Sequence, residues 1–208
     1  MLTLDAAAGA LCDAEGRRFD PGARVWRPHG RAAEGEAVSL RTAVRWLQRD
    51  SGHPVTAPIG VIGPREASPA QCAAAEEIGA ALAEMGIAVL CGGRQGVMEA
   101  VCRGAASRGG LAIGLLPEAD TSGANPHVTI ALATGIGEAR NALIARAAFC
   151  LVAVGNSYGT LSEVALGLQF GKRVFGLEGA ATVDGVRHVE SPQAAADAVA
   201  RFLLNLDD

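Results

Sequence analysis

The sequence has few of the features that mark zinc proteins, disulfide-stabilised proteins and membrane proteins. Its five cysteines are an odd number and form no CxxC pair, so buried reduced thiols fit better than disulfides or a zinc site. Its four scattered histidines give a metal site little support. No apolar run approaches the roughly 18 residues of a membrane-spanning helix without a charge or a glycine, and no signal peptide opens the chain. We therefore expect a soluble, cytoplasmic protein with no metal and no membrane partner.

Two common nucleotide-binding motifs are also absent. The chain has neither the G-x-G-x-x-G of NAD-binding proteins nor the G-x-x-x-x-G-K-[ST] of P-loop ATPases. A net charge of −4 argues against a general nucleic-acid binder. Half of the residues are hydrophobic and the mean hydropathy is +0.24, which excludes a disordered chain. The 208 residues are enough for one domain with a sizeable core and an appendage.

Residues 1–54 differ in pattern from the rest of the chain. Residues 17–28 place an Asp-Pro-Gly turn signal between two short segments, which predicts a hairpin. Residues 39–49 put apolar side chains on one face of a helix and arginines on another. We interpret residues 1–54 as a small N-terminal appendage, either packed against the protein or used as an oligomer contact. A lid that covers a ligand is the alternative.

Residues 55–208 alternate between apolar runs and helical patterns. Near-continuous apolar strands separated by helices are typical of a parallel sheet that is covered on both faces. We therefore predict an α/β fold, a doubly wound Rossmann-like domain, which binds ligands at the carboxyl ends of its strands. The expected strands are residues 59–63, 87–90, 111–116, 128–133, 150–154 and 173–177, and the pattern also allows a short one at 186–189. The expected helices are residues 68–85, 97–108, 138–148, 160–170 and one that begins at 192.

The segment 149–170 combines a buried strand, a turn of small residues and a helix start. The first N–H groups of a helix have no intrahelical partner, and the helix dipole favours negative charge there. Glycines let the backbone approach a phosphate closely, and hydroxyl side chains add donors. The turn is therefore a candidate anion site, although an ordinary capped βα turn explains the same pattern. Its candidate ligand-binding residues are Gly155, Asn156, Ser157, Gly159 and Thr160.

A second glycine-rich turn, residues 92–96, follows another predicted strand. A single glycine cluster is a weak signal. Two such turns in one parallel sheet, both at helix starts, favour a small phosphorylated ligand. The candidate ligand-binding residues of this turn are Gly92, Gly93 and Gly96.

Residues 135–171 resemble the signature region of the LOG family, whose members were once labelled lysine decarboxylases. Arg140 stands fifteen residues before Gly155, the interval at which the family has its motif arginine. Residues 159–163 match the family's G-T-x-x-E, and residues 92–98 match its G-G-x-x-G-x-M loop. The resemblance covers about residues 59–177. It is strongest to the subgroup similar to molybdenum-cofactor carriers, for which Asn125-Pro126 and a G-E-A-R-N run are typical.

The resemblance implies a phosphoribohydrolase, which releases the base and ribose 5-phosphate from a nucleoside 5′-monophosphate and needs no cofactor. By this resemblance, Glu163 would stabilise an oxocarbenium-like centre. Arg140 would orient the phosphate or ribose and keep Glu163 ionised. A purely structural ion pair between the two residues is the alternative. The resemblance also implies a homodimer, which can assemble into a tetramer, with the helices near Arg140 and Glu163 contributing to the contact.

The chain departs from the LOG pattern at two places. It has Gly155-Asn156-Ser157 where LOG enzymes have Pro-Gly-Gly, and Asn141 replaces the lysine that follows the motif arginine. The second hypothesis is therefore a non-catalytic carrier or sensor of a nucleotide monophosphate or of the molybdenum cofactor. A purely structural role is a third reading, and it leaves the two glycine turns unexplained. Glu138 and His127 are weaker candidates for the site.

Overall fold

The computed structural model describes residues 1–29 and 35–206. The chain forms two compact units, one of residues 57–196 and one of residues 1–56 with 197–208. We call them the parallel-sheet unit and the N-terminal unit. The domain division that we predicted at residue 54 stays a prediction. The contacts differ from it in one respect, because they group the last residues of the chain with the N-terminal unit.

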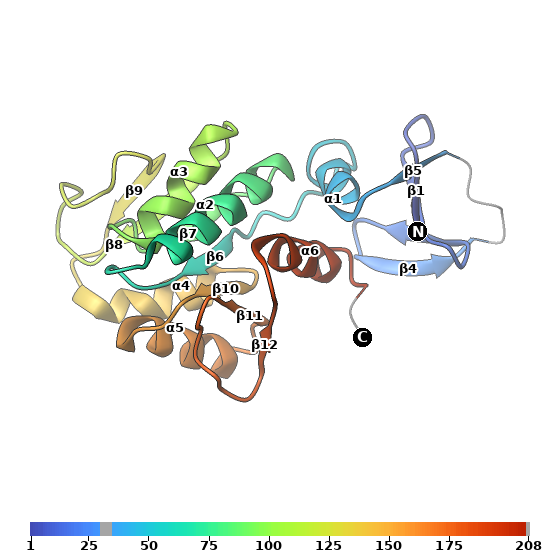
Figure 1. Ribbon diagram of the computed structural model, residues 1–208. Helices are drawn as coiled ribbons and strands as arrows, with labels where there is room; N and C mark the ends of the chain where they lie inside the picture. The colour runs from blue at the N-terminus through green and yellow to red at the C-terminus, as the bar shows by residue number, and fades with distance from the viewer. Residues whose placement is uncertain (30–34, 207–208) are drawn as a thin grey trace. The chain divides into compact units, whose positions relative to one another are not determined.

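The parallel-sheet unit is built on seven parallel strands in the order β12-β11-β10-β6-β7-β8-β9 (Figure 1). This α/β arrangement confirms the predicted fold class. Every residue of β6, β7, β10 and β11 is buried, which explains why these strands read as apolar runs with no polar alternation. The strands are β6 (Ile59–Ile62), β7 (Val89–Cys91), β8 (Ala112–Leu116), β9 (Ile130–Ala133), β10 (Leu151–Val154), β11 (Val174–Leu177) and β12 (Val186–His188).

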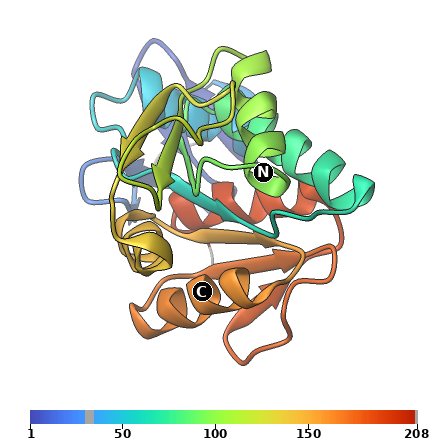
Figure 2. The same ribbon diagram turned by 90° about the vertical axis from the view of Figure 1, so that its left-hand side faces the viewer.

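Two pairs of helices cover this sheet. Helices α2 and α3 pack together on one face, and α4 and α5 pack together on the other (Figures 1 and 2). A short 3-10 helix, η1, leads directly into α4. The elements are α2 (Pro69–Glu84), α3 (Val97–Ser107), η1 (Gly137–Arg140), α4 (Asn141–Ala147), α5 (Tyr158–Gln169) and α6 (Pro192–Leu203).

Strand order reverses between β6 and β10. After β6 the chain continues through β7 to β8 and β9 on one side, and after β10 it continues to β11 and β12 on the other. The loops that follow two neighbouring strands therefore diverge at their carboxyl ends, which is where open α/β sheets bind ligands.

The helix starts follow their capping residues. Ser68 caps α2 by accepting from the Gln71 N–H, and the Gln71 side chain accepts from the Ser68 N–H, as the sequence predicts. Helix α5 begins at Tyr158 and not at Thr160, because Ser157 is its N-cap and accepts from the Thr160 N–H.

The N-terminal unit holds a five-stranded antiparallel sheet in the order β4-β3-β2-β1-β5 and the helix α1 (Leu40–Arg49). The predicted hairpin is β3 and β4. The other three strands were missed in the sequence because each has only three or four residues. The strands are β1 (Leu2–Asp5), β2 (Ala10–Cys12), β3 (Arg17–Asp20), β4 (Val25–Pro28) and β5 (Glu36–Val38).

The end of α6 is tied to the β3–β4 hairpin by side chains. The Arg24 guanidinium donates to the carbonyl oxygens of Phe202 and Leu203, at 2.7–3.1 Å. The Trp26 indole N–H donates to the Leu204 carbonyl at 2.7 Å. The arginine places a cation at the negative end of the helix dipole and satisfies carbonyls that a helix leaves without partners.

Among the described residues, no helix combines the length and the apolar character needed to cross a bilayer.

Candidate functional site

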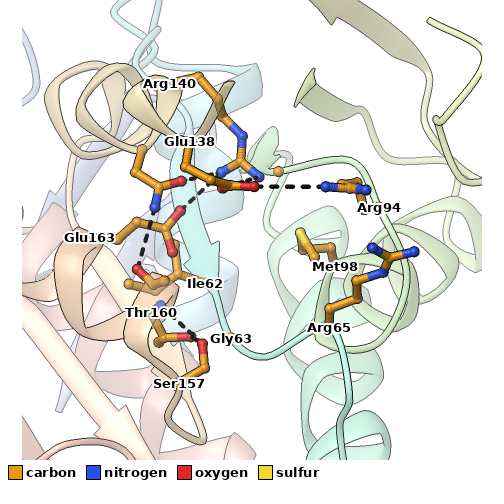
Figure 3. A pocket seen from close by; sticks show the side chains of 13 residues that line it. Ile62, Gly63, Arg65, Arg94, Met98, Glu138, Arg140, Ser157, Thr160 and Glu163 are labelled. Carbon is orange, nitrogen blue, oxygen red and sulfur yellow. Dashed lines mark hydrogen bonds and ion pairs between the residues drawn. The ribbon is translucent and has the colours of Figure 1, made fainter. Parts of the chain in front are cut away.

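A cavity of about 120 Å³ lies at the carboxyl ends of the central strands, entirely within the parallel-sheet unit. Ile62 and Gly63, at the end of β6, lie between its two sides (Figure 3). Glu138 from η1 also lines it. We call one side the α5 wall; it consists of Arg140, Asn141, Ser157, Gly159, Thr160 and Glu163. The other side is the loop wall, which consists of Arg65, Gly92, Arg94 and Met98.

The start of helix α5 supplies the anion-binding part of the α5 wall. Ser157 Oγ accepts from the Thr160 N–H at 3.1 Å and lies 2.9 Å from Thr160 Oγ1. Thr160 is buried, with 2 % of its surface exposed. The two hydroxyls that were predicted as phosphate donors therefore contact each other, and the Ser157 hydroxyl also caps the helix. The N–H groups at this helix start and the positive end of the helix dipole face a cavity.

A buried pair of charged residues stands next to the helix start. Arg140 Nη1 lies 3.5 Å from Glu163 Oε1, and only 4 % and 6 % of these residues are exposed. The same guanidinium donates to Asn141 Oδ1, and the Asn141 amide donates to Ser162 Oγ at 2.9 Å. Arg140 Nε is buried and has no hydrogen-bond partner among the described residues. The structure thus brings Arg140 and Glu163 together at the cavity, which is compatible with both a ligand site and an ion pair.

The charge state of Glu163 differs from the expectation that Arg140 keeps it ionised. Burial raises the pKa of Glu163 from its ordinary value of 4.5 to about 8, Arg140 opposes this rise, and Glu138 adds to it. Desolvation outweighs the nearby cation because the carboxyl has almost no contact with water. At neutral pH Glu163 is mainly a neutral acid.

The loop wall is shaped by its glycines. A Cβ at Gly92 would lie 2.6 Å from Arg140 Nη2 and 2.7 Å from Met98 Sδ, so only glycine lets the arginine come this close. Gly96 has a φ of +70° and is the N-cap of α3; its Cβ would lie 2.2 Å from the Arg65 carbonyl oxygen. The buried Asn125 amide donates to the Gly93 and Arg94 carbonyls, both at 3.0 Å. These two hydrogen bonds hold the loop in place.

Two arginines of the loop wall carry its charge. Arg65 is exposed, and Arg94 keeps 23 % of its side chain exposed. Arg94 Nη2 lies 3.3 Å from Glu118 Oε1, and Arg94 Nη1 lies 3.8 Å from Glu138 Oε1. Sequence reasoning missed both arginines as site residues. The one available signal for Arg94 was its position inside the glycine turn.

The structure divides the predicted site residues into two groups. Arg140, Glu163 and four of the predicted ligand-binding residues line the cavity, namely Gly92, Ser157, Gly159 and Thr160. Four others belong to the same two turns but do not line it: Gly93, Gly96, Gly155 and Asn156. Three of these four are glycines with φ between +70° and +73°, which shape the turns instead. Among the described residues, no group of three or more His, Cys, Asp or Glu side chains could hold a metal ion.

Comparison with known proteins points to one group. The model of the SLOG cluster4 family matches residues 56–201. An uncharacterized protein of Archaeoglobus fulgidus is 40 % identical over 137 residues, which is 66 % of this chain and 90 % of that protein. The molybdenum cofactor binding protein of Rippkaea orientalis is 34 % identical with a TM-score of 0.67, covering 70 % of this chain and 97 % of its own. The molybdenum cofactor carrier protein of Chlamydomonas reinhardtii is 36 % identical with a TM-score of 0.65, covering 71 % and 98 %.

Proposed function

The chain belongs to the SLOG cluster4 family, and on that premise we propose that it is a carrier or sensor of a phosphorylated ligand such as the molybdenum cofactor. The α5 wall carries this proposal. A helix start and the buried Arg140 face one cavity, and both favour a phosphate group. Relatives whose names state that they bind or carry the molybdenum cofactor support this ligand.

The size of the cavity limits what it holds. Pockets that enclose a whole drug-sized ligand have roughly 300–1,000 Å³. At about 120 Å³, this cavity is large enough for a phosphate group and its immediate neighbours. We infer that it takes the phosphate end of the ligand, while the rest lies outside the cavity.

The charge state of Glu163 does not fit the hydrolytic role that the LOG resemblance gives it. Glycoside hydrolysis uses two carboxyl groups, one as acid and one as base or nucleophile. The two acidic residues that line this cavity are Glu163 and Glu138. Burial makes Glu163 mainly neutral at neutral pH, so it supplies no carboxylate charge for an oxocarbenium ion. Glu138 Oε1 lies 3.8 Å from Arg94 Nη1 and its Oε2 lies 3.9 Å from Arg140 Nη2, so we keep hydrolysis as the second candidate.

Mass spectrometry of the ligand released from the purified native protein tests the proposal. We expect a phosphorylated pterin or nucleotide in the wild-type protein and much less of it in the Arg140→Met variant. Binding of inorganic phosphate, followed by calorimetry, should weaken in the same variant. A protein that carries no such ligand and has no affinity for phosphate would contradict the proposal.

Hydrolysis of nucleoside 5′-monophosphates is the second candidate, because Arg140 and Glu163 meet at the cavity with the spacing found in LOG enzymes. Incubation with AMP and related monophosphates should then release free base. Equal and negligible release by wild type and Glu163→Ala at high protein concentration would exclude it.

A homodimer or tetramer belongs to the same proposal. Strand β9 forms one edge of the parallel sheet, and its Ile130 and Leu132 are 43 % and 47 % exposed. Exposed apolar side chains on an edge strand are suited to a contact between copies. Light scattering should show an assembly in the wild-type protein and a smaller species in Leu132→Lys.

Five cysteines without disulfides are compatible with the cytoplasm, which we also propose as the location of the protein.

A further inference from the structure

Glu138 makes a contact with each wall of the cavity. Its Oε1 lies 3.8 Å from Arg94 Nη1, and its Oε2 lies 3.9 Å from Arg140 Nη2. Figure 3 shows the Glu138 carboxylate between the two guanidinium groups, with a dashed line to Arg94. A negatively charged group of the protein therefore occupies the position between two arginines that come from different parts of the fold.

The contacts of Glu138 are easily broken. Both distances are near the limit for an ion pair, and the Glu138 side chain is 70 % exposed, so each ion pair is weak. The Gly137 N–H next to Glu138 donates to the Pro117 carbonyl at 3.0 Å, so the backbone is held and only the exposed side chain has to turn. Gly137 has a φ of +58°, and a Cβ there would meet nothing within 4 Å. Glu138 can therefore swing into solvent with little loss of packing.

The two arginines are held without Glu138. Arg94 pairs with Glu118 at 3.3 Å, and Asn125 fixes its carbonyl. Arg140 is buried, donates to Asn141 and still has Nε without a partner among the described residues. When Glu138 leaves, both guanidinium groups stay close to their present places. An arginine pair held in this way is a preformed position for an anion.

This position is distinct from the start of α5. By the proposed function, the helix start binds a phosphate through backbone N–H groups next to Ser157, whereas the second position uses the side chains of Arg94 and Arg140. The Glu138 side chain is 70 % exposed, so the second position lies at the solvent-exposed side of the cavity, where the part of the ligand outside the cavity can reach it.

We propose that the space between Arg94 and Arg140 is a second anion-binding position, which Glu138 fills in the free protein and which a second anionic group of the ligand takes by displacing it. The proposal rests on the proposed function and narrows the ligand class to phosphate esters that carry another anionic group. Glu138 is then an internal competitor, and it selects against esters with a single phosphate, which cannot displace it.

Calorimetry with matched synthetic probes tests this. The probes are linear alkanediol bisphosphates of two to six carbons, each compared with the monophosphate of the same diol. Glu138→Gln should raise the affinity for the best bisphosphate roughly threefold to tenfold, because two weak ion pairs no longer have to be broken. Arg94→Gln should lower that affinity about tenfold. The ratio of bisphosphate to monophosphate affinity should therefore rise in Glu138→Gln and fall in Arg94→Gln.

Glu66→Gln is the control for total charge, because Glu66 is exposed and follows Arg65 in the chain. Two results would overturn the second position and leave the proposed function standing. One is that Glu66→Gln and Glu138→Gln raise the affinity for the bisphosphate equally. The other is that Glu138→Gln raises the affinity for the bisphosphate and for the monophosphate equally. A bisphosphate gain in Glu138→Gln without measurable monophosphate binding would support the second position and count against the α5 wall as the main phosphate site. If no probe binds to any variant, both proposals are wrong.

Discussion

The two walls of the cavity are built by different means. The α5 wall is made of buried side chains that hold one another: Arg140, Asn141, Thr160 and Glu163 each have 6 % or less of their surface exposed. The loop wall presents arginines that are partly or largely exposed, and glycine backbone fixes its shape. One wall is thus specified by side-chain chemistry and the other by backbone conformation. We expect side-chain substitutions to lower the free energy of unfolding strongly in the α5 wall and only slightly in the loop wall. Substitutions that disturb the backbone should lower it more in the loop wall.

Glu163→Gln should give the largest change in the free energy of unfolding, and the size of this change should depend on pH. The folded carboxyl keeps its proton up to about pH 8, whereas in the unfolded chain it loses the proton near 4.5. Its contribution to stability is therefore fully present below about pH 4.5 and is lost as the pH rises through about 8. At about 1.4 kcal/mol per pKa unit, the loss reaches up to about 5 kcal/mol. Denaturant unfolding from pH 4 to 9 should show the wild type losing stability relative to Glu163→Gln over this range.

Glu66→Gln, which removes an exposed carboxylate, is the control in that series. A stability difference between wild type and Glu163→Gln that stays constant from pH 4 to 9 would contradict the buried neutral acid.

Gly96→Ala should be costly in the loop wall. Its φ of +70° and a would-be Cβ 2.2 Å from the Arg65 carbonyl oxygen combine strain with a backbone clash. We expect the free energy of unfolding to fall by about 3 kcal/mol or more. Gly109→Ala is the matched control, with a φ of +67° and nothing within 4 Å of its Cβ, and it should cost only about 1 kcal/mol. Similar losses in the two variants, measured by urea unfolding, would show that the loop can move aside.

Ser157→Ala separates capping from ligand binding in the α5 wall. Ser39 caps α1 by the same pattern, in which its Oγ accepts from the N–H of a threonine three residues later and contacts that hydroxyl. Both Ser157→Ala and Ser39→Ala should lower stability by about 1 kcal/mol. Only Ser157→Ala should also weaken phosphate binding in calorimetry. If Ser39→Ala weakens phosphate binding to the same extent, the weaker binding results from the lower stability of the protein and not from the loss of a ligand contact.

Arg94→Gln should have the smallest effect on stability. Its ion pairs with Glu118 and Glu138 are partly exposed, so their loss should change the free energy of unfolding by less than about 0.5 kcal/mol. Thermal unfolding in matched buffers measures this. A loss above about 2 kcal/mol would mean that the loop wall depends on its side chains as the α5 wall does.

The order of strands and helices in the parallel-sheet unit is readable from the sequence, because buried parallel strands leave apolar runs and helix starts leave capping residues. Ser68 and Gln71 illustrate this, since both parts of their capping box are present. The pairing of Arg140 with Glu163 was expected from motif spacing. The neutral state of Glu163 was not, because it depends on how deeply other elements bury the carboxyl, and no local pattern records that depth.

Two other features escaped prediction for similar reasons. An arginine in a loop, such as Arg65 or Arg94, has the same local pattern whether it faces a cavity or solvent. The contacts of Arg24 and Trp26 with the end of α6 join residues that are nearly 180 positions apart. Contacts at that separation arise only from the folded arrangement.

Those last contacts have a consequence for the order in which the protein is made. Ribosomes release residues 1–56 long before residues 197–206, and the latter carry the carbonyl groups to which Arg24 and Trp26 donate. Those contacts therefore form only after residues 57–196, the parallel-sheet unit, have been synthesised. During that interval the hairpin lacks the acceptors that the end of α6 supplies, so its packing is completed only once α6 has been made.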